Sequence, residues 1–133
     1  MADMNFASGN KASTATVLSA VRIAVGAASL LAPDLSGRII GFPRGHLNGS
    51  SRAMGRLFGI REIVLGVLTL DAVRRDPADR RIYLANAAAD GADGLVYAAA
   101  LLGRQGIPRA AVGSLALALP VAATWLKLAN ETR

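Results

Sequence analysis

The chain contains no cysteine and only one histidine, His46. The lack of cysteine excludes disulfides, thiolate catalysis and cysteine-based metal sites, and one histidine cannot by itself form a multi-histidine metal site. His46 also has no serine partner at a recognisable spacing, so no nucleophile–base–acid triad is indicated. The residues thus predict neither a metal nor a cofactor, and they leave open whether the protein is an enzyme.

Aromatic residues make up only 5% of the chain, and its 9 acidic residues are outnumbered by 15 Lys and Arg residues, for a net charge of +6. A nucleic-acid-binding protein gathers its basic residues on one face, with aromatic residues between them. Here the basic residues fall mostly in the segments that separate four apolar blocks, as expected for a protein that faces anionic lipid headgroups. We therefore expect membrane lipids, and not nucleic acid, as partners.

Apolar residues form 53% of the chain, and the mean hydropathy is +0.39. They gather in four blocks, at about 14–32, 50–73, 80–102 and 109–128. Each block approaches the roughly 20 helical residues that cross the hydrocarbon core of a bilayer. The 133 residues, a length that suits one domain, are therefore predicted to form an all-α, four-helix transmembrane bundle with short connectors over 13–133, after a flexible polar tail at 1–12.

The segments between the blocks carry the residues that end helices. They hold all the prolines except Pro120, which lies inside the last block, where membrane helices tolerate a kink. The first connector contains a short amphipathic sequence, LSGRIIGF at 35–42, which forms either an interfacial helix or a loop. Tyr83 and Trp125 lie near block ends, and we expect their rings at the membrane interface.

The order of the blocks also predicts a topology. An even number of spans places both termini on the same side of the membrane. That side carries slightly more Lys and Arg than the opposite side, and an excess of basic residues marks the cytoplasmic side. We therefore expect a multi-pass protein of the cell membrane with both termini in the cytoplasm.

Ionisable residues interrupt three of the four blocks. An ionisable side chain near the bilayer centre costs about 3 kcal/mol on insertion scales, so it usually faces the interior of a bundle and has a partner there. In the third block, Asn86, Asp90, Asp93 and Tyr97 are spaced by four, three and four residues. At 100° per residue this spacing puts them on one stripe of a helix.

Arg22 in the first block and Glu62 in the second each share a helix face with small residues, which let another backbone approach closely. Arg61 lies about 100° around the helix from Glu62, toward another seam or the lipid. Two arginines and three carboxyls would form two bidentate pairs and leave one carboxyl over. We expect that surplus acid, Asp90 or Asp93, to stay protonated.

The candidate residues of this functional network are Arg22, Arg61, Glu62, Asn86, Asp90, Asp93 and Tyr97. One interpretation is that the network only fixes the register of the helices, as buried polar groups sometimes do. Another is that it handles protons or a polar headgroup inside the bundle. A third is a soluble fold in which DGADG at 90–94 is a loop or a helix cap.

Three segments carry a resemblance to a known group of proteins: RIAVGAASLLAP at 22–33, GRLFGIREIVLGVLTL at 55–70 and AAADGADGLVYAAALL at 87–102. The chain resembles small four-helix membrane proteins of actinobacteria that carry a domain of unknown function and are broadly DoxX-like. The most specific matches are Arg22, the GIRE sequence at 59–62 and the Asp90/Asp93 pair. The resemblance implies a four-helix membrane architecture and a loose link with respiratory quinol oxidation, which transfers to no residue here.

Three functions fit these observations. The first is a non-enzymatic accessory subunit or homo-oligomer, whose small-residue faces also suit contacts with other membrane proteins. The second is a small proton-linked transporter that titrates Glu62, Asp90 and Asp93, with Arg22 as their counter-ion. The third is an enzyme that acts on a lipid-like substrate, with a neutral aspartic acid as the general acid.

Overall fold

The computed structural model describes residues 2–77 and 79–132, with side chains from residue 10 onward. Throughout that part of the chain the only regular elements are helices, which confirms the predicted all-α class. They are α1 (Ala2–Leu31), α2 (Pro33–Ile40), a 3₁₀ helix η1 (Arg44–His46), α3 (Gly49–Arg75), α4 (Arg80–Leu102) and α5 (Pro108–Asn130).

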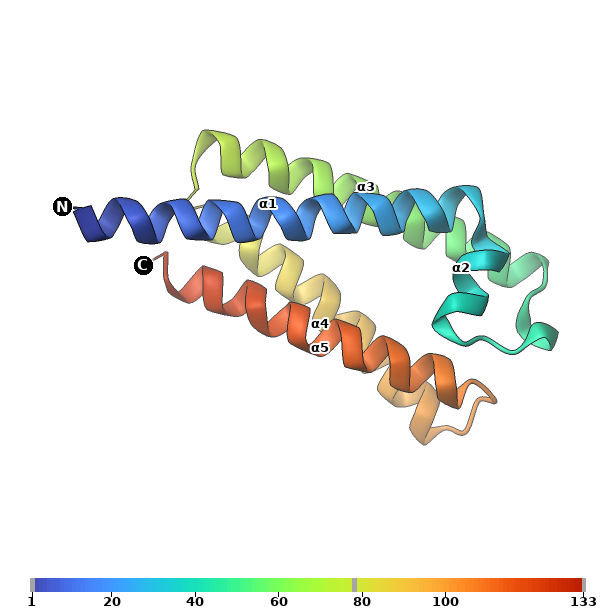
Figure 1. Cartoon of the computed structure of the whole chain (residues 1–133). Helices are drawn as coiled ribbons and strands as arrows, with labels where there is room; N and C mark the ends of the chain where they lie inside the picture. Colours follow the sequence, from blue (N-terminus) through green and yellow to red (C-terminus); the bar gives the residue numbers. More distant parts are fainter. Residues whose placement is uncertain (1, 78, 133) are drawn as a thin grey trace.

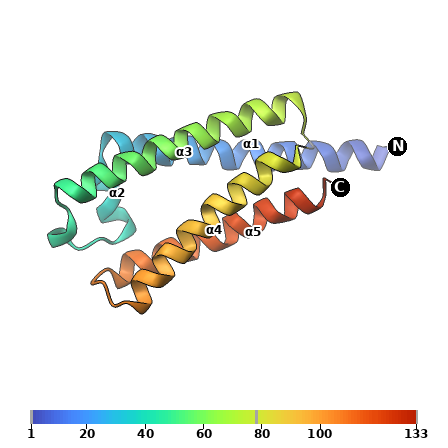
Figure 2. The same cartoon turned by 180° about the vertical axis from the view of Figure 1, so that it is seen from behind.

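The four long helices form two antiparallel pairs, in which α1 lies along α3 and α4 lies along α5 (Figure 1). The two pairs are close together near the chain termini and diverge toward the end that carries α2, as both views show (Figures 1 and 2). At that end α2 contacts α1, α3 and α5. Direct packing between the two pairs is sparse compared with the packing inside each pair.

The helix ends follow from local capping. At the start of α3 the Asn48 side chain accepts a hydrogen bond from the Ser51 backbone N–H (3.1 Å), and Ser51 Oγ accepts one from the Asn48 N–H (2.8 Å). This reciprocal capping box satisfies two otherwise unpaired donors. The α4 helix begins similarly, because the Asp79 carboxylate accepts from the Arg81 N–H.

The first connector differs from the prediction of short connectors, because it contains α2 and η1. The bundle therefore has five α-helices where we predicted four, and most of the segment 35–42 is helical. Proline at the first position of α2 and the left-handed Gly41 (φ +106°) after its end are typical helix boundaries. Helix α1 begins at Ala2, so it takes in nearly all of the predicted 1–12 tail; residue 1 lies outside the described residues, and the flexibility of the tail stays a prediction.

Two helical segments in the described part of the chain are long and apolar enough to cross a membrane. They are Asn10–Leu31 in α1 and Pro108–Asn130, which is the whole of α5, each with a mean hydropathy of 1.6. The helices α3 and α4 have comparable lengths, but charged residues interrupt their apolar runs. A membrane location is therefore compatible with the structure.

Glycines bring α1 and α3 into backbone contact. A Cβ atom added at Gly26 would lie 2.6 Å from the Gly59 carbonyl oxygen, and one added at Gly59 would lie 2.5 Å from the Gly26 carbonyl oxygen. One added at Gly66 would lie 2.9 Å from the Ser19 carbonyl oxygen. The prediction that this glycine face of the second block allows a close helix contact is confirmed, and its partner is α1.

An aromatic pair lies at the end of the bundle where the helix pairs converge. Tyr83 and Trp125 stack with ring centroids 6.0 Å apart, and both side chains are fully buried. The Tyr83 hydroxyl donates to the Pro77 carbonyl oxygen at 2.7 Å. The two rings form the largest part of a small core between α4 and α5 that Ala15 and Val73 complete from α1 and α3, and their place at a membrane interface stays a prediction.

Candidate functional site

The centre of the site is the guanidinium of Arg22 on α1, which binds two carboxylates from two other helices. Its Nη1 donates to Oε1 and Oε2 of Glu62 on α3, at 3.0 and 2.9 Å. Its Nη2 donates to both oxygens of Asp90 on α4, each at 2.6 Å. One side chain thus joins three helices and both helix pairs.

Arg61 on α3 continues the arrangement toward the edge of the bundle. Its Nε and Nη2 donate to Glu62 Oε1 at 3.3 and 3.1 Å. Its Nη1 donates to Asp93 Oδ1 at 2.8 Å, and its Nη2 forms a short ion pair with Asp93 Oδ2. The guanidinium also lies 5.2 Å from the centre of the Phe58 ring, a cation–π distance. Arg61 therefore bridges the seam between α3 and α4, one of the two positions that its place on the helix allowed.

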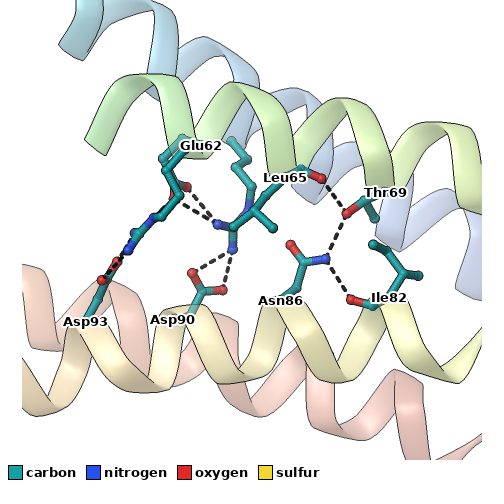
Figure 3. A network of polar contacts seen from close by, with 9 residues as sticks. Glu62, Leu65, Thr69, Ile82, Asn86, Asp90 and Asp93 are labelled. Atoms are coloured by element: carbon teal, nitrogen blue, oxygen red, sulfur yellow. Dashed lines mark hydrogen bonds and ion pairs between the residues drawn. The ribbon is translucent and has the colours of Figure 1, made fainter. Parts of the chain in front are cut away.

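Together these contacts form a row of alternating charges, in the order Asp90, Arg22, Glu62, Arg61 and Asp93. We call this row the charge ladder. Figure 3 shows Glu62 on α3 facing Asp90 and Asp93 on α4. We predicted two arginine–carboxylate pairs and one surplus carboxyl. In the structure each arginine instead bridges two carboxylates, so every carboxylate of the ladder contacts an arginine.

Burial changes along the ladder from its interior end to its outer end. The side chains of Arg22, Glu62 and Asp90 are 4%, 8% and 10% exposed. Those of Arg61 and Asp93 are 39% and 23% exposed. The interior end is therefore held in a low-dielectric surrounding, where an unpaired charge is most costly, and the outer end reaches the surface of the bundle.

The position of Arg22 depends on the glycine contact between α1 and α3. Gly26 lies one helical turn after Arg22, and Gly59 lies just under one turn before Glu62. Because the two backbones touch at these glycines, the guanidinium reaches past α3 to the carboxylate on α4. A wider helix spacing would leave the same residues on the same faces without the bridge.

A second polar bridge joins α3 to α4 further along the seam. Asn86 Nδ2 donates to Thr69 Oγ1 at 2.8 Å and to the Ile82 carbonyl oxygen at 2.9 Å. Thr69 in turn donates to the Leu65 carbonyl oxygen (Figure 3). Sequence reasoning placed Asn86 in the network but missed Thr69, which could have been found because it lies seven residues after Glu62 and therefore on the same face of the helix.

The structure brings together six of the seven predicted network residues. Five of them form the ladder, Asn86 forms the neighbouring bridge, and Tyr97 lies apart. Tyr97 is half-buried, and among the described residues no hydrogen bond joins it to the ladder. The guanidinium groups occupy the carboxylate oxygens of the ladder. Over residues 2–77 and 79–132, no group of three or more histidine or carboxylate side chains is placed to hold a metal ion.

Comparisons of the chain with protein-family models, curated proteins and solved structures found no match. The resemblance to DoxX-like proteins therefore stays a prediction.

Proposed function

We propose that the protein is an integral membrane protein, most simply a non-enzymatic accessory or oligomeric bundle, in which α1, α3, α4 and α5 cross the bilayer. The charge ladder holds the two helix pairs together, a role that we call the clasp. In this proposal the protein is multi-pass, and both termini lie in the cytoplasm. The lipids of the cell membrane and further membrane proteins, or a second copy of the chain, are its partners.

The observation that supports a membrane location is an inverted distribution of polarity. The buried positions hold many alanines together with polar side chains, among them Ser19, Arg22, Glu62, Asn86 and Asp90. The exposed positions hold large apolar side chains on every long helix: Val17, Val21 and Val25 on α1, Leu57, Val64 and Leu68 on α3, Leu95 and Val96 on α4, and Val112, Leu117 and Leu119 on α5. Water-soluble domains rarely expose apolar surface so continuously, whereas hydrocarbon solvates it.

The two membrane-capable segments also support a membrane location. The core helix of a soluble protein is mostly buried, but only 28% of the apolar window in Asn10–Leu31 and 22% of that in Pro108–Asn130 is buried in the bundle. Their apolar side chains must therefore be covered by something outside the chain. Lipid covers them without any further requirement.

The other two long helices, α3 and α4, can cross a membrane because their central charges are paired. These central charges all belong to the ladder: they are Arg61 and Glu62 on α3, and Asp90 and Asp93 on α4. Charged residues within a membrane are expected to face the bundle interior and to bind one another. Every charge of the ladder has a partner, and its interior end, Arg22, Glu62 and Asp90, faces the bundle interior. Apolar side chains remain on the outer faces of both helices.

The ladder is assigned this role because few other contacts join the two helix pairs in the middle of the bundle. Apolar side chains gain nothing from leaving lipid for another helix, so association inside a bilayer depends on close packing and on polar contacts. Packing holds α1 to α3 and α4 to α5. Between the pairs, the ladder and the Asn86–Thr69 bridge supply the polar contacts away from the termini; near the termini, Lys11 on α1 also donates to the Glu131 carbonyl oxygen at the end of α5.

Membrane insertion is tested by extraction and by labelling. We expect the expressed protein to stay in the membrane fraction through alkaline carbonate and urea washes and to be released by detergent. Because the chain has no cysteine, a single cysteine reports its own accessibility. Gly45→Cys and Gln105→Cys, at the end that carries α2, should react with a membrane-impermeant maleimide in intact cells, whereas Arg74→Cys, at the opposite end, should react only after permeabilisation. Release in plain buffer as a monodisperse protein would contradict the proposal.

A proton-linked carrier is the second candidate, favoured by the composition of the ladder. Three carboxylates face two guanidiniums, so the fully ionised ladder carries one net negative charge. One bound proton would balance it, and the partly exposed Asp93 offers an entry point. The enzyme hypothesis gains no such support, because neither of two surface hollows, one at the α2 end and one near the termini, is lined by a ladder residue.

Proton flux separates the clasp from the carrier. In liposomes that enclose a pH-sensitive dye, a carrier should accelerate acidification several-fold over protein-free liposomes after a proton gradient is imposed. Asp93→Asn should abolish that flux, and Asp71→Asn, which removes an exposed carboxylate paired with Arg75 outside the ladder, should not. A bundle that is only clasped should show the protein-free rate for all three proteins.

A further inference from the structure

The corner where α1 ends and α2 begins contains a hollow of about 520 Å³. The end of α1, the first turns of α2 and the first two turns of α3 line it, so three helices define its shape. The segments that line it belong to the end of the bundle where the two helix pairs diverge (Figure 2). None of the ladder residues reaches it.

Three arginines and one carboxylate line this hollow, which gives it an excess of positive charge. Arg52 Nε donates to both oxygens of Asp34, at 2.9 and 3.1 Å. Arg38 and Arg56 also line the hollow, and within residues 2–77 and 79–132 neither forms an ion pair. Two guanidinium groups are therefore free to bind an anion.

The electrostatics of Asp34 are consistent with three arginines placed around it. The hydrogen bond from Arg52 is the main reason that the pKa of Asp34 lies below its ordinary value; desolvation opposes this shift, and the charges of Arg52, Arg38 and Arg56 each add a smaller lowering. Asp34 thus stays ionised at neutral pH and neutralises only one of the three guanidiniums.

Apolar side chains flank the basic ones. Leu31 at the end of α1 is 81% exposed, and Leu35 in α2 is 58% exposed; both line the hollow. A ligand that binds here meets guanidinium donors on one side and apolar side chains on the other. Free phosphate can bind only the guanidiniums, whereas a phospholipid can bind the guanidiniums with its phosphate and contact the apolar side chains with its acyl chains.

We propose that this corner binds the phosphate group of an anionic phospholipid, with Arg38 and Arg56 as the donors, Arg52 neutralised by its pair with Asp34, and the acyl chains against Leu31 and Leu35. Guanidinium groups bind phosphate through paired N–H donors in a planar fork. The choice of a lipid rests on the proposed membrane location. The binding of a phosphate group rests on the hollow alone.

The test uses the full chain in detergent micelles and measures binding by calorimetry with three probes: dihexanoyl phosphatidylglycerol, dihexanoyl phosphatidylcholine and inorganic phosphate. We expect phosphatidylglycerol to bind on the order of tenfold more tightly than either of the other probes, since it adds apolar contact to the phosphate and lacks the opposing choline charge. The double variant Arg38→Gln/Arg56→Gln should lose at least tenfold in affinity, because charge-assisted hydrogen bonds are removed.

Two further variants make the result specific. Arg44→Gln removes an exposed arginine of η1 at the same end of the bundle, and it should leave binding unchanged. Asp34→Asn frees Arg52 and should tighten binding. Equal losses in Arg44→Gln and in the double variant would overturn the proposal, as would the absence of phosphatidylglycerol binding. Equal affinity for inorganic phosphate and phosphatidylglycerol would overturn the lipid assignment.

Calorimetry and the extraction test together distinguish failure of the site from failure of the proposed function. A chain that inserts in membranes but shows no preference for phosphatidylglycerol would refute the lipid site and leave the membrane bundle intact. A chain that is released in plain buffer would refute the membrane bundle, and with it the lipid assignment.

Discussion

Arg22→Met is expected to lower the free energy of unfolding by about 3–5 kcal/mol, the range found when one partner of a buried ion pair is removed. The reason is that Arg22 donates to Glu62 and Asp90 at once, and both carboxylates are at least nine-tenths buried. Without the guanidinium, one of these two carboxylates must take up a proton or draw water into the bundle. Unfolding in detergent micelles titrated with dodecyl sulfate, followed by circular dichroism, measures the loss.

The matched control is Arg44→Met, which removes an exposed arginine and should change stability by no more than about 0.5 kcal/mol. If Arg22→Met fails to fold, Arg22→Lys keeps the charge but lacks the planar fork that serves two carboxylates, and it should fold with an intermediate loss. A triple variant that replaces Arg22, Glu62 and Asp90 by apolar residues of similar volume should recover much of the loss, because no unpaired charge remains. A loss in Arg22→Met no larger than that of the control would contradict the clasp.

Gly59→Ala is expected to cost about 1–3 kcal/mol, the range for overpacking a tight contact. The new methyl carbon would lie 2.5 Å from the Gly26 carbonyl oxygen and 2.8 Å from the Leu30 nitrogen, and both are backbone atoms that no side-chain rotation can move. Helices α1 and α3 must therefore separate, which also draws Arg22 away from Asp90. The same dodecyl sulfate titration measures the effect.

Gly91→Ala is the matched control, because a Cβ atom at Gly91 would meet nothing within 4 Å. Alanine is favoured over glycine in a helix by about 1 kcal/mol, so this variant should be neutral or more stable than the parent. The two glycine substitutions are thus expected to have opposite signs. Equal effects would mean that the α1–α3 contact does not set the position of the ladder.

The sequence predicted features that depend only on spacing along one helix. The four apolar blocks correspond to the four long helices, because a run of apolar residues bounded by prolines and capping residues determines a helix locally. Asn86, Asp90 and Asp93 lie on one face of α4, and Gly59, Glu62 and Gly66 lie on one face of α3, because 100° per residue determines which residues share a face. That the charges of the three helices meet was also predictable, since buried charges need partners.

Only the tertiary structure decided which charges meet and in what order. A guanidinium has five N–H donors, so charge counting could not tell two separate pairs from a ladder in which each arginine bridges two carboxylates. The difference lies in the spacing between helices, which the Gly26–Gly59 contact sets across a sequence separation that no local pattern spans. The buried Tyr83–Trp125 stack follows from the same cause: periodicity determines the direction in which a side chain points, and the packing of the helices determines what it contacts.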